Sequence, residues 1–176
     1  MEREKYIINE RTKMNLNRLF ITFFGTGLAP KAPGTVGSFA GLIAGVLILE
    51  VFPMQTLFML TIAITVIAIF EINKYERETG THDDKSIVID EVAGIWIAMM
   101  FAISTAQSMN YPFAWEIALL VSFASFRLFD IWKPSTIGTI DRKVKGGLGV
   151  MGDDILAGIA GGFLSVIILM GLNSIL

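Results

Sequence analysis

The sequence has no cysteine, one histidine and few charged residues. Without cysteine there can be no disulfide, no thiolate metal site and no cysteine nucleophile. Charged residues make up 17% of the chain, against roughly 25% in an ordinary soluble domain. The net charge of −2 is too small to suggest nucleic acid as a partner. Hydrophobic residues reach 53% with a mean hydropathy of +0.64, which indicates an integral membrane protein.

The first 18 residues are polar and show no features of a cleavable signal peptide. We therefore expect a polar cytoplasmic segment over residues 1–18. The remainder, residues 19–176, is predicted to form a single helical membrane domain.

Long apolar segments predict the number of membrane crossings, because a spanning helix needs about 20 mostly apolar residues. Five segments qualify: 36–52, 54–72, 87–103, 112–129 and 155–172. Segment 87–103 is the weakest of these because it is short and carries two acids. A sixth apolar segment, 19–29, is too short to cross and contains Gly25 and Gly27, so we expect it to be interfacial or re-entrant. The prediction is an all-α, multi-pass membrane helical bundle of about five transmembrane helices.

The positive charges lie on one side of this predicted bundle. All 14 lysines and arginines fall before residue 34, within 73–85 or within 127–151, and the alternate connections have none. Since cytoplasmic loops carry an excess of Lys and Arg, the N-terminus is predicted to be cytoplasmic and the C-terminus outside. Fourteen of the 16 acids lie on the same inner side, the exceptions being Glu50 and Glu116. We therefore expect the activity of the protein at the cytoplasmic face.

Five carboxylates are predicted to lie at three inner helix ends: Asp90, Glu91, Asp130, Asp153 and Asp154. For the two adjacent pairs, which open the third and fifth segments, an ordinary alternative is helix capping and a favourable dipole interaction. For Asp130, which ends the fourth segment, the alternative is an ion pair with Arg127 or Lys133. Together, however, the five would repel one another unless a cation were present. Hard oxygen ligands of this kind suit Mg²⁺.

Basic residues and glycine-rich stretches accompany these acids. Arginine and lysine match phosphate oxygens, although the topology rule and anionic headgroups also account for some of them. The basic candidates are Lys31, Arg127, Lys133, Arg142, Lys143 and Lys145. The stretch 25–38 is predicted to form a rigid turn in which Ser38 caps the first spanning helix. The stretch GGLGVMGDD is predicted to bring backbone N–H groups close to an anion just before a helix begins.

His82, eight residues before Asp90, is a candidate general acid or metal ligand, although a lone loop histidine usually has no specific role. A histidine-based lipid phosphatase would need a second histidine. The aspartyl-nucleophile motif D-x-D-x-[TV] and the phosphatidyltransferase pattern DG-x-x-AR do not occur. These absences leave metal-assisted attack at a phosphorus centre.

Three charged stretches together resemble the phosphatidylglycerophosphatase A family. They are GTGLAPKAPGTVGS at 25–38, HDDKSIVIDEVAG at 82–94, and FRLFDIWKP at 126–134 continuing to DRKVKGGLGVMGDDILAG at 141–158. Two positions differ from the family pattern, since Lys85 replaces an expected glycine and Pro134 is not followed by a second proline.

The resemblance implies a Mg²⁺-dependent enzyme of the bacterial inner membrane that hydrolyses phosphatidylglycerophosphate to phosphatidylglycerol and phosphate. It implies metal binding by Asp90, Glu91, Asp130, Asp153 and Asp154. The expected catalytic residues are Asp90, Glu91, Asp130 and Asp154, with His82 as a further candidate from its place before Asp90. It implies phosphate binding by Lys133 and Arg142, and Lys31, Thr35 and Arg127 are further phosphate-binding candidates from their place near the acids. Water attack and an aspartyl-phosphate intermediate are both compatible with these residues, as are one metal ion and two. The competing hypothesis is a non-enzymatic channel or lipid-binding scaffold with an acidic cytoplasmic ring.

Overall fold

The structure is a computed structural model that describes residues 15–81, 84–109, 112–134, 137 and 144–175. Two short elements come first, helix α2 (Leu16–Ile21) and the 3-10 helix η1 (Thr26–Leu28). Five long helices follow: α3 (Pro33–Val51), α4 (Met54–Thr79), α5 (Ile89–Ala106), α6 (Ala114–Trp132) and α8 (Gly147–Asn173). Within these described residues there is no strand, which confirms the all-α prediction.

Four of the described helices, α3, α4, α5 and α8, are long and apolar enough to cross a membrane. Helix α6 is not among them, although its segment was predicted as a fifth span. It carries three charged residues, Glu116, Arg127 and Asp130, in 19 positions. The protein is therefore a helical membrane bundle with four candidate spans and a fifth long helix.

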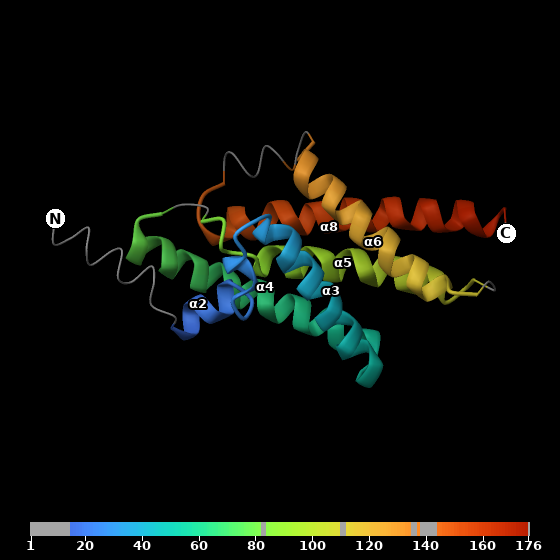
Figure 1. The fold of residues 1–176 in the computed structure, drawn as a ribbon, viewed down its shortest axis with the longest axis horizontal. Helices are drawn as coiled ribbons and strands as arrows, with labels where there is room; N and C mark the ends of the chain where they lie inside the picture. The colour runs from blue at the N-terminus through green and yellow to red at the C-terminus, as the bar shows by residue number, and fades with distance from the viewer. Residues whose placement is uncertain (1–14, 82–83, 110–111, 135–136, 138–143, 176) are drawn as a thin grey trace.

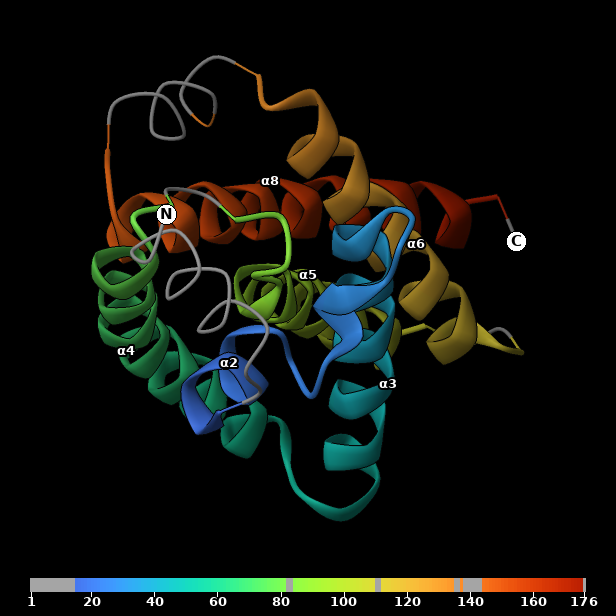
Figure 2. The same ribbon diagram turned by 60° about the vertical axis from the view of Figure 1, so that its left-hand side comes forward.

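Helix α5 lies at the centre of the bundle and contacts α3, α4, α6 and α8. Figure 2 shows α5 between α4 and α3, with α8 running above it. In its apolar window 61% of the residues are buried, against 22–33% in the other three candidate spans. Segment 87–103 was the weakest predicted span because a helix surrounded by protein does not need a continuous apolar surface toward lipid.

Close helix packing in the bundle depends on glycines. Gly41 and Gly45 of α3 face side chains of α5, and Gly37 faces Val88, the cap residue just before α5. At this contact the Trp96 indole N–H donates a 2.7 Å hydrogen bond to the Gly41 carbonyl. Gly158 of α8 lies directly against the backbone of Gly94 in α5. Small residues of this kind let two helix backbones approach each other closely.

Two predicted helix starts are wrong. Helix α8 begins at Gly147, eight residues before the predicted 155, so Asp153 and Asp154 lie about two turns inside it and do not open it. Gly147, Gly149 and Gly152 of this stretch are therefore helical, and only Gly146, at the cap position, precedes the helix. The Asn73 side chain accepts a 2.9 Å hydrogen bond from the Gly147 N–H at the start of this helix.

Helix α3 begins at Pro33, so Ser38 is not its cap. Ala32 occupies the cap position, and Ser38 lies inside the helix, where its hydroxyl donates to the Gly34 carbonyl at 2.7 Å. Proline suits the first position of a helix because its missing N–H would have no partner there. The interfacial segment predicted for 19–29 contains the second half of α2 and all of η1, and both are too short to cross a membrane. The division of the chain at residue 18 stays a prediction.

The elements alternate in direction along the bundle (Figure 1). The segments that precede α5 and α8 lie at the end of the molecule near α2, whereas the α3–α4 connection and the C-terminus lie toward the opposite end. The starts of α3, α5 and α8 and the end of α6 are therefore grouped on one side.

Candidate active site

The start of α5 is held in place by the segment before it. Asp84 accepts hydrogen bonds of 3.0 Å from the Ser86 N–H and from the Tyr75 hydroxyl on α4. The Val88 N–H donates to the Ile21 carbonyl of α2, also at 3.0 Å. These bonds connect three elements and place Asp90 and Glu91 in the first turn of α5, where the sequence predicted them.

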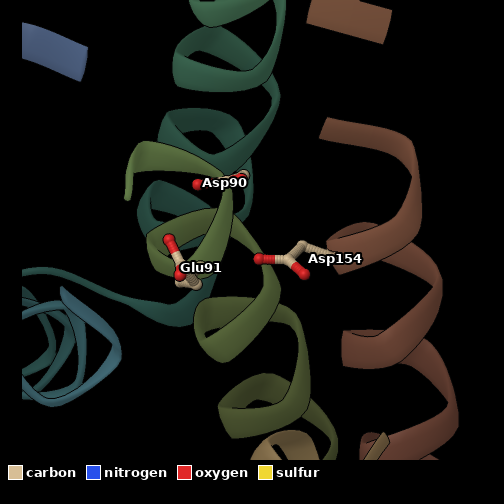
Figure 3. A group of neighbouring side chains, drawn as sticks. All are labelled: Asp90, Glu91 and Asp154. Carbon is tan, nitrogen blue, oxygen red and sulfur yellow. The ribbon is translucent and has the colours of Figure 1, made fainter. Parts of the chain in front are cut away.

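Asp90 and Glu91 meet Asp154 of α8. One carboxylate oxygen from each of the three residues lies within 4.8 Å of the other two. Figure 3 shows the Asp154 side chain extending from α8 toward α5. The contact between Gly94 and Gly158, one turn further along each helix, explains this proximity, because any larger side chain at Gly158 would separate the two helices.

The geometry of the three carboxylates fits a divalent cation. Asp90 Oδ1 and Glu91 Oε2 are buried and have no hydrogen-bond partner in the described part of the chain. Two charges 4.8 Å apart repel by about 3.5 kcal/mol at an effective dielectric constant of about 20. Buried charged oxygens are stable only when a positive charge or hydrogen-bond donors offset their charge. Three carboxylates are a donor set that suits Mg²⁺, which would supply that positive charge. We refer to Asp90, Glu91 and Asp154 as the acidic triad.

The two remaining acids have cationic partners. Lys133 Nζ lies 2.5 Å from Asp153 Oδ2, which joins the end of α6 to α8. Asp130 forms an ion pair with Arg127, as one of the alternatives for this residue predicted. Asp130 and Asp153 line the same cavity as Asp154. The structure therefore places all five acids together and separates them into a triad and two ion pairs.

One cavity of about 210 Å³ contains the whole group. Its wall includes Pro33 and Gly34 of α3 and the cations Lys85 and Lys133. It also includes the five predicted acids, Asp90, Glu91, Asp130, Asp153 and Asp154. Opposite charges facing one small cavity can bind a cation and an anion side by side, as a metal–phosphate complex requires.

The predicted phosphate-binding residues differ in position. Lys133 lines the cavity, whereas Lys31 is exposed and is not part of the cavity wall. Arg127 connects α6 to α3, since it donates to the Ser38 and Thr35 hydroxyls at 3.2 Å each. These contacts suit a positioning role for Arg127 and Thr35. His82 and Arg142 lie outside the described residues, so their roles stay predictions.

Sequence reasoning missed several residues of this site. Lys85 entered only as a departure from the family pattern, yet it lines the cavity, and its place five residues before Asp90 could have indicated this. Asn73, Tyr75 and Asp84 support the starts of α5 and α8 through hydrogen bonds. The Asn73 contact joins positions 74 apart in the sequence, and no local pattern predicts it. Tyr75 and Asp84 lie only nine positions apart.

Gly34 allows a mutational test of the acidic triad. A methyl group at this position would collide with the Glu91 carboxylate, whose oxygen is the nearest atom to it. Because that oxygen ends a flexible side chain, Gly34→Ala should displace Glu91 and leave the fold intact. We expect Gly34→Ala to lower turnover by about 10–100-fold, the range for residues that orient a metal ligand, and to leave the melting temperature within a few degrees. Gly171→Ala is the matched control, because a methyl group there meets no atom within 4 Å. Unchanged turnover in Gly34→Ala would show that the position of Glu91 is not critical.

Comparison with known proteins gives one consistent result. The family model described as phosphatidylglycerophosphatase A matches residues 19–169. A phosphatidylglycerophosphatase A of Escherichia coli is 37% identical over 160 residues, which cover 90% of this chain and 87% of the relative. A protein of the same name from Haemophilus influenzae is 36% identical and covers 83% of this chain and 84% of its own.

A Bacteroides thetaiotaomicron protein with the provisional name phosphatidylinositol-3-phosphatase is 36% identical, covering 78% of this chain and 84% of its own. No solved structure matches the chain. The family match covers most of the chain and includes every described residue of the cavity, which confirms the resemblance and identifies a phosphatase. The chain belongs to the phosphatidylglycerophosphatase A family.

Proposed function

We propose that this phosphatase removes the terminal phosphate from phosphatidylglycerophosphate, at the cytoplasmic face of the inner membrane, with Mg²⁺ as its cofactor. The observation that carries the proposal is a cavity at one end of a membrane bundle, in which five acids face two lysines. The substrate assignment rests on the names of the relatives from Escherichia coli and Haemophilus influenzae. The family match argues against the alternative of a non-enzymatic channel or scaffold.

The acidic triad is the proposed metal site. Asp90, Glu91 and Asp154 would hold Mg²⁺, which when bound supplies positive charge and Lewis acidity to the phosphate oxygens. The unpartnered oxygens of Asp90 and Glu91 support this assignment.

The other cavity residues position and neutralise the phosphate. Phosphoryl transfer depends mainly on positioning and charge stabilisation, because the protein has little covalent chemistry to perform. Lys133 and Lys85 face the cavity and would offset the charge on the phosphate oxygens. Arg127 holds Asp130 at the cavity wall, where its carboxylate can accept a proton from the attacking water.

The orientation rests on the distribution of basic residues. Of the lysines and arginines that the structure describes, none lies on the α3–α4 connection, in the described part of the α5–α6 connection or at the C-terminus. The positive-inside rule then places the cavity on the cytoplasmic side. Because the chain has no cysteine, the single variants Lys74→Cys and Ser174→Cys can each be labelled cleanly in intact cells. An impermeant thiol reagent should label only the Ser174→Cys variant, and labelling of the Lys74→Cys variant instead would reverse the orientation.

Phosphate release from the purified protein tests the activity directly. Protein in detergent should release inorganic phosphate from phosphatidylglycerophosphate with Mg²⁺ and stop when EDTA is added. Excess Mg²⁺ should restore the rate, and that recovery controls for damage to the protein. Parallel assays on phosphatidate and phosphatidylinositol 3-phosphate measure selectivity, since the Bacteroides relative carries a different substrate name. A rate that is unaffected by EDTA would contradict the metal proposal.

A further inference from the structure

An apolar groove lies between α6 and α8. Its volume is about 450 Å³. The α8 wall consists of Leu156, Ile159, Ala160 and Phe163, and Phe129 contributes from α6. Phe163 is 57% exposed, so this part of the groove is open along the side of the bundle. Helix α8 is a candidate span, and the groove therefore faces the region of the lipid acyl chains.

The groove and the acidic cavity occupy consecutive turns of the same two helices. On α8, Asp153 lines the cavity, and Leu156 and Ala160, three and seven residues later, line the groove. Residues at this spacing share one face of a helix, and Ala160 lies about 10 Å along the axis from Asp153. On α6, the Lys133 N–H donates to the Phe129 carbonyl at 2.8 Å. Lys133 lines the cavity and Phe129 lines the groove. The Lys133–Asp153 ion pair thus stands where the two sites adjoin.

We propose that this α6–α8 groove binds one acyl chain of the lipid substrate while its phosphate occupies the acidic cavity. This inference rests on the proposed function, since it concerns how the same substrate is held. A phosphorylated lipid has a polar headgroup at one end and apolar acyl chains at the other. The polar cavity and the adjoining apolar groove therefore match the two ends of the lipid. The acyl chain reaches the groove from the side of the bundle, where Phe163 is exposed.

The groove acts mainly by positioning. Lipid tails are as apolar as leucine side chains, so moving a tail from the bilayer into the groove gains little hydrophobic free energy. Packing against Leu156 and Ala160 instead restricts where the tail can lie and so fixes the distance of the phosphate from the triad. Misplacement of a reacting group by about 1 Å can cost on the order of 10²-fold in rate.

Filling the groove tests this proposal. Ala160→Phe places a ring in the groove, and Ile159→Trp is a second variant that narrows it from the same helix. Ile167→Phe is the matched control, because Ile167 is 67% exposed on α8 and does not line the groove. Each full-length protein is assayed on long-chain phosphatidylglycerophosphate and on the same headgroup without acyl chains. A lipid with a photoreactive acyl chain shows directly where the tail binds.

We expect both groove variants to lower kcat/KM for the long-chain lipid by about tenfold and to leave the rate on the deacylated headgroup within about twofold. The photoreactive lipid should label residues 156–163 of the wild type and label Ala160→Phe weakly.

Equal losses on both substrates, no loss on either, or labelling confined to other helices would overturn the proposal. A shift from dimer to monomer in the groove variants, with an unchanged preference for the long chain, would assign the groove to a second copy of the chain instead. If the wild type releases phosphate from neither substrate, the proposed function fails, and the labelling pattern still decides whether the groove binds a tail.

Discussion

Asp90→Asn should lower phosphate release by on the order of 10³-fold while the protein still folds and inserts into the membrane. The substitution keeps the shape of the side chain and removes a charged oxygen that has no hydrogen-bond partner among the described residues. A neutral amide binds Mg²⁺ far less well than a carboxylate. Steady-state phosphate release from phosphatidylglycerophosphate measures the effect.

The stability of this variant should change in the opposite direction to its activity. Without metal, the wild-type triad holds three acids within 4.8 Å, and replacing one removes part of their repulsion. The metal-free Asp90→Asn protein should therefore melt at the same temperature as the wild type or higher. Glu116→Gln is the matched control, because Glu116 is exposed in the first turn of α6, toward the other end of the bundle. An inactive Asp90→Asn protein that melts well below the wild type would indicate a structural role for this residue.

Lys133→Met should reduce both stability and activity. Asp153 has a side chain only 6% exposed, and the substitution takes away the cation that lies 2.5 Å from its carboxylate. Breaking a fully buried pair costs about 3–5 kcal/mol, and since Lys133 is about one third exposed we expect about 2 kcal/mol here. Turnover should fall by about 10²-fold because the phosphate loses a positive charge in the cavity.

The double variant Lys133→Met/Asp153→Asn separates these two effects. Removing the charge of Asp153 should recover most of the lost stability, because the buried carboxylate that Lys133 neutralises is then replaced by a neutral amide. It should not recover turnover, since the cavity still lacks the lysine. Thermal unfolding and phosphate release, measured on the same preparations, check both parts. Recovery of turnover together with stability would show that Lys133 only maintains the fold.

The sequence predicted the fold class and the residues of the site better than it predicted their arrangement. Long apolar segments predict where a chain crosses the membrane, and loops that carry Lys and Arg on one side only predict its orientation. Most of the helices could therefore be located from the sequence. The acids stood out because charge is rare in such a composition. The roles of individual acids could not be predicted, since ion pairs such as Lys133–Asp153 join residues 20 positions apart on different helices.

The errors have identifiable physical causes. Hydropathy marks the apolar part of a helix and not its end, so the glycine-rich first turns of α8 are predicted to precede the helix, and its two acids are predicted to open it. The central position of α5 could not be seen from its composition, because burial by other helices lowers the need for apolar residues. The three charges of α6 reflect its place beside the cavity, where Arg127 and Asp130 face protein rather than lipid.

The central claim is that α5 and α8 contribute carboxylates to one divalent-cation site. Titration of Mn²⁺, followed by electron paramagnetic resonance, measures this binding without any substrate. The account predicts that the wild type binds the ion and that Asp90→Asn and Asp154→Asn, one from each helix, each weaken binding by about 100-fold or more. Binding as tight as that of the wild type in either variant would contradict it.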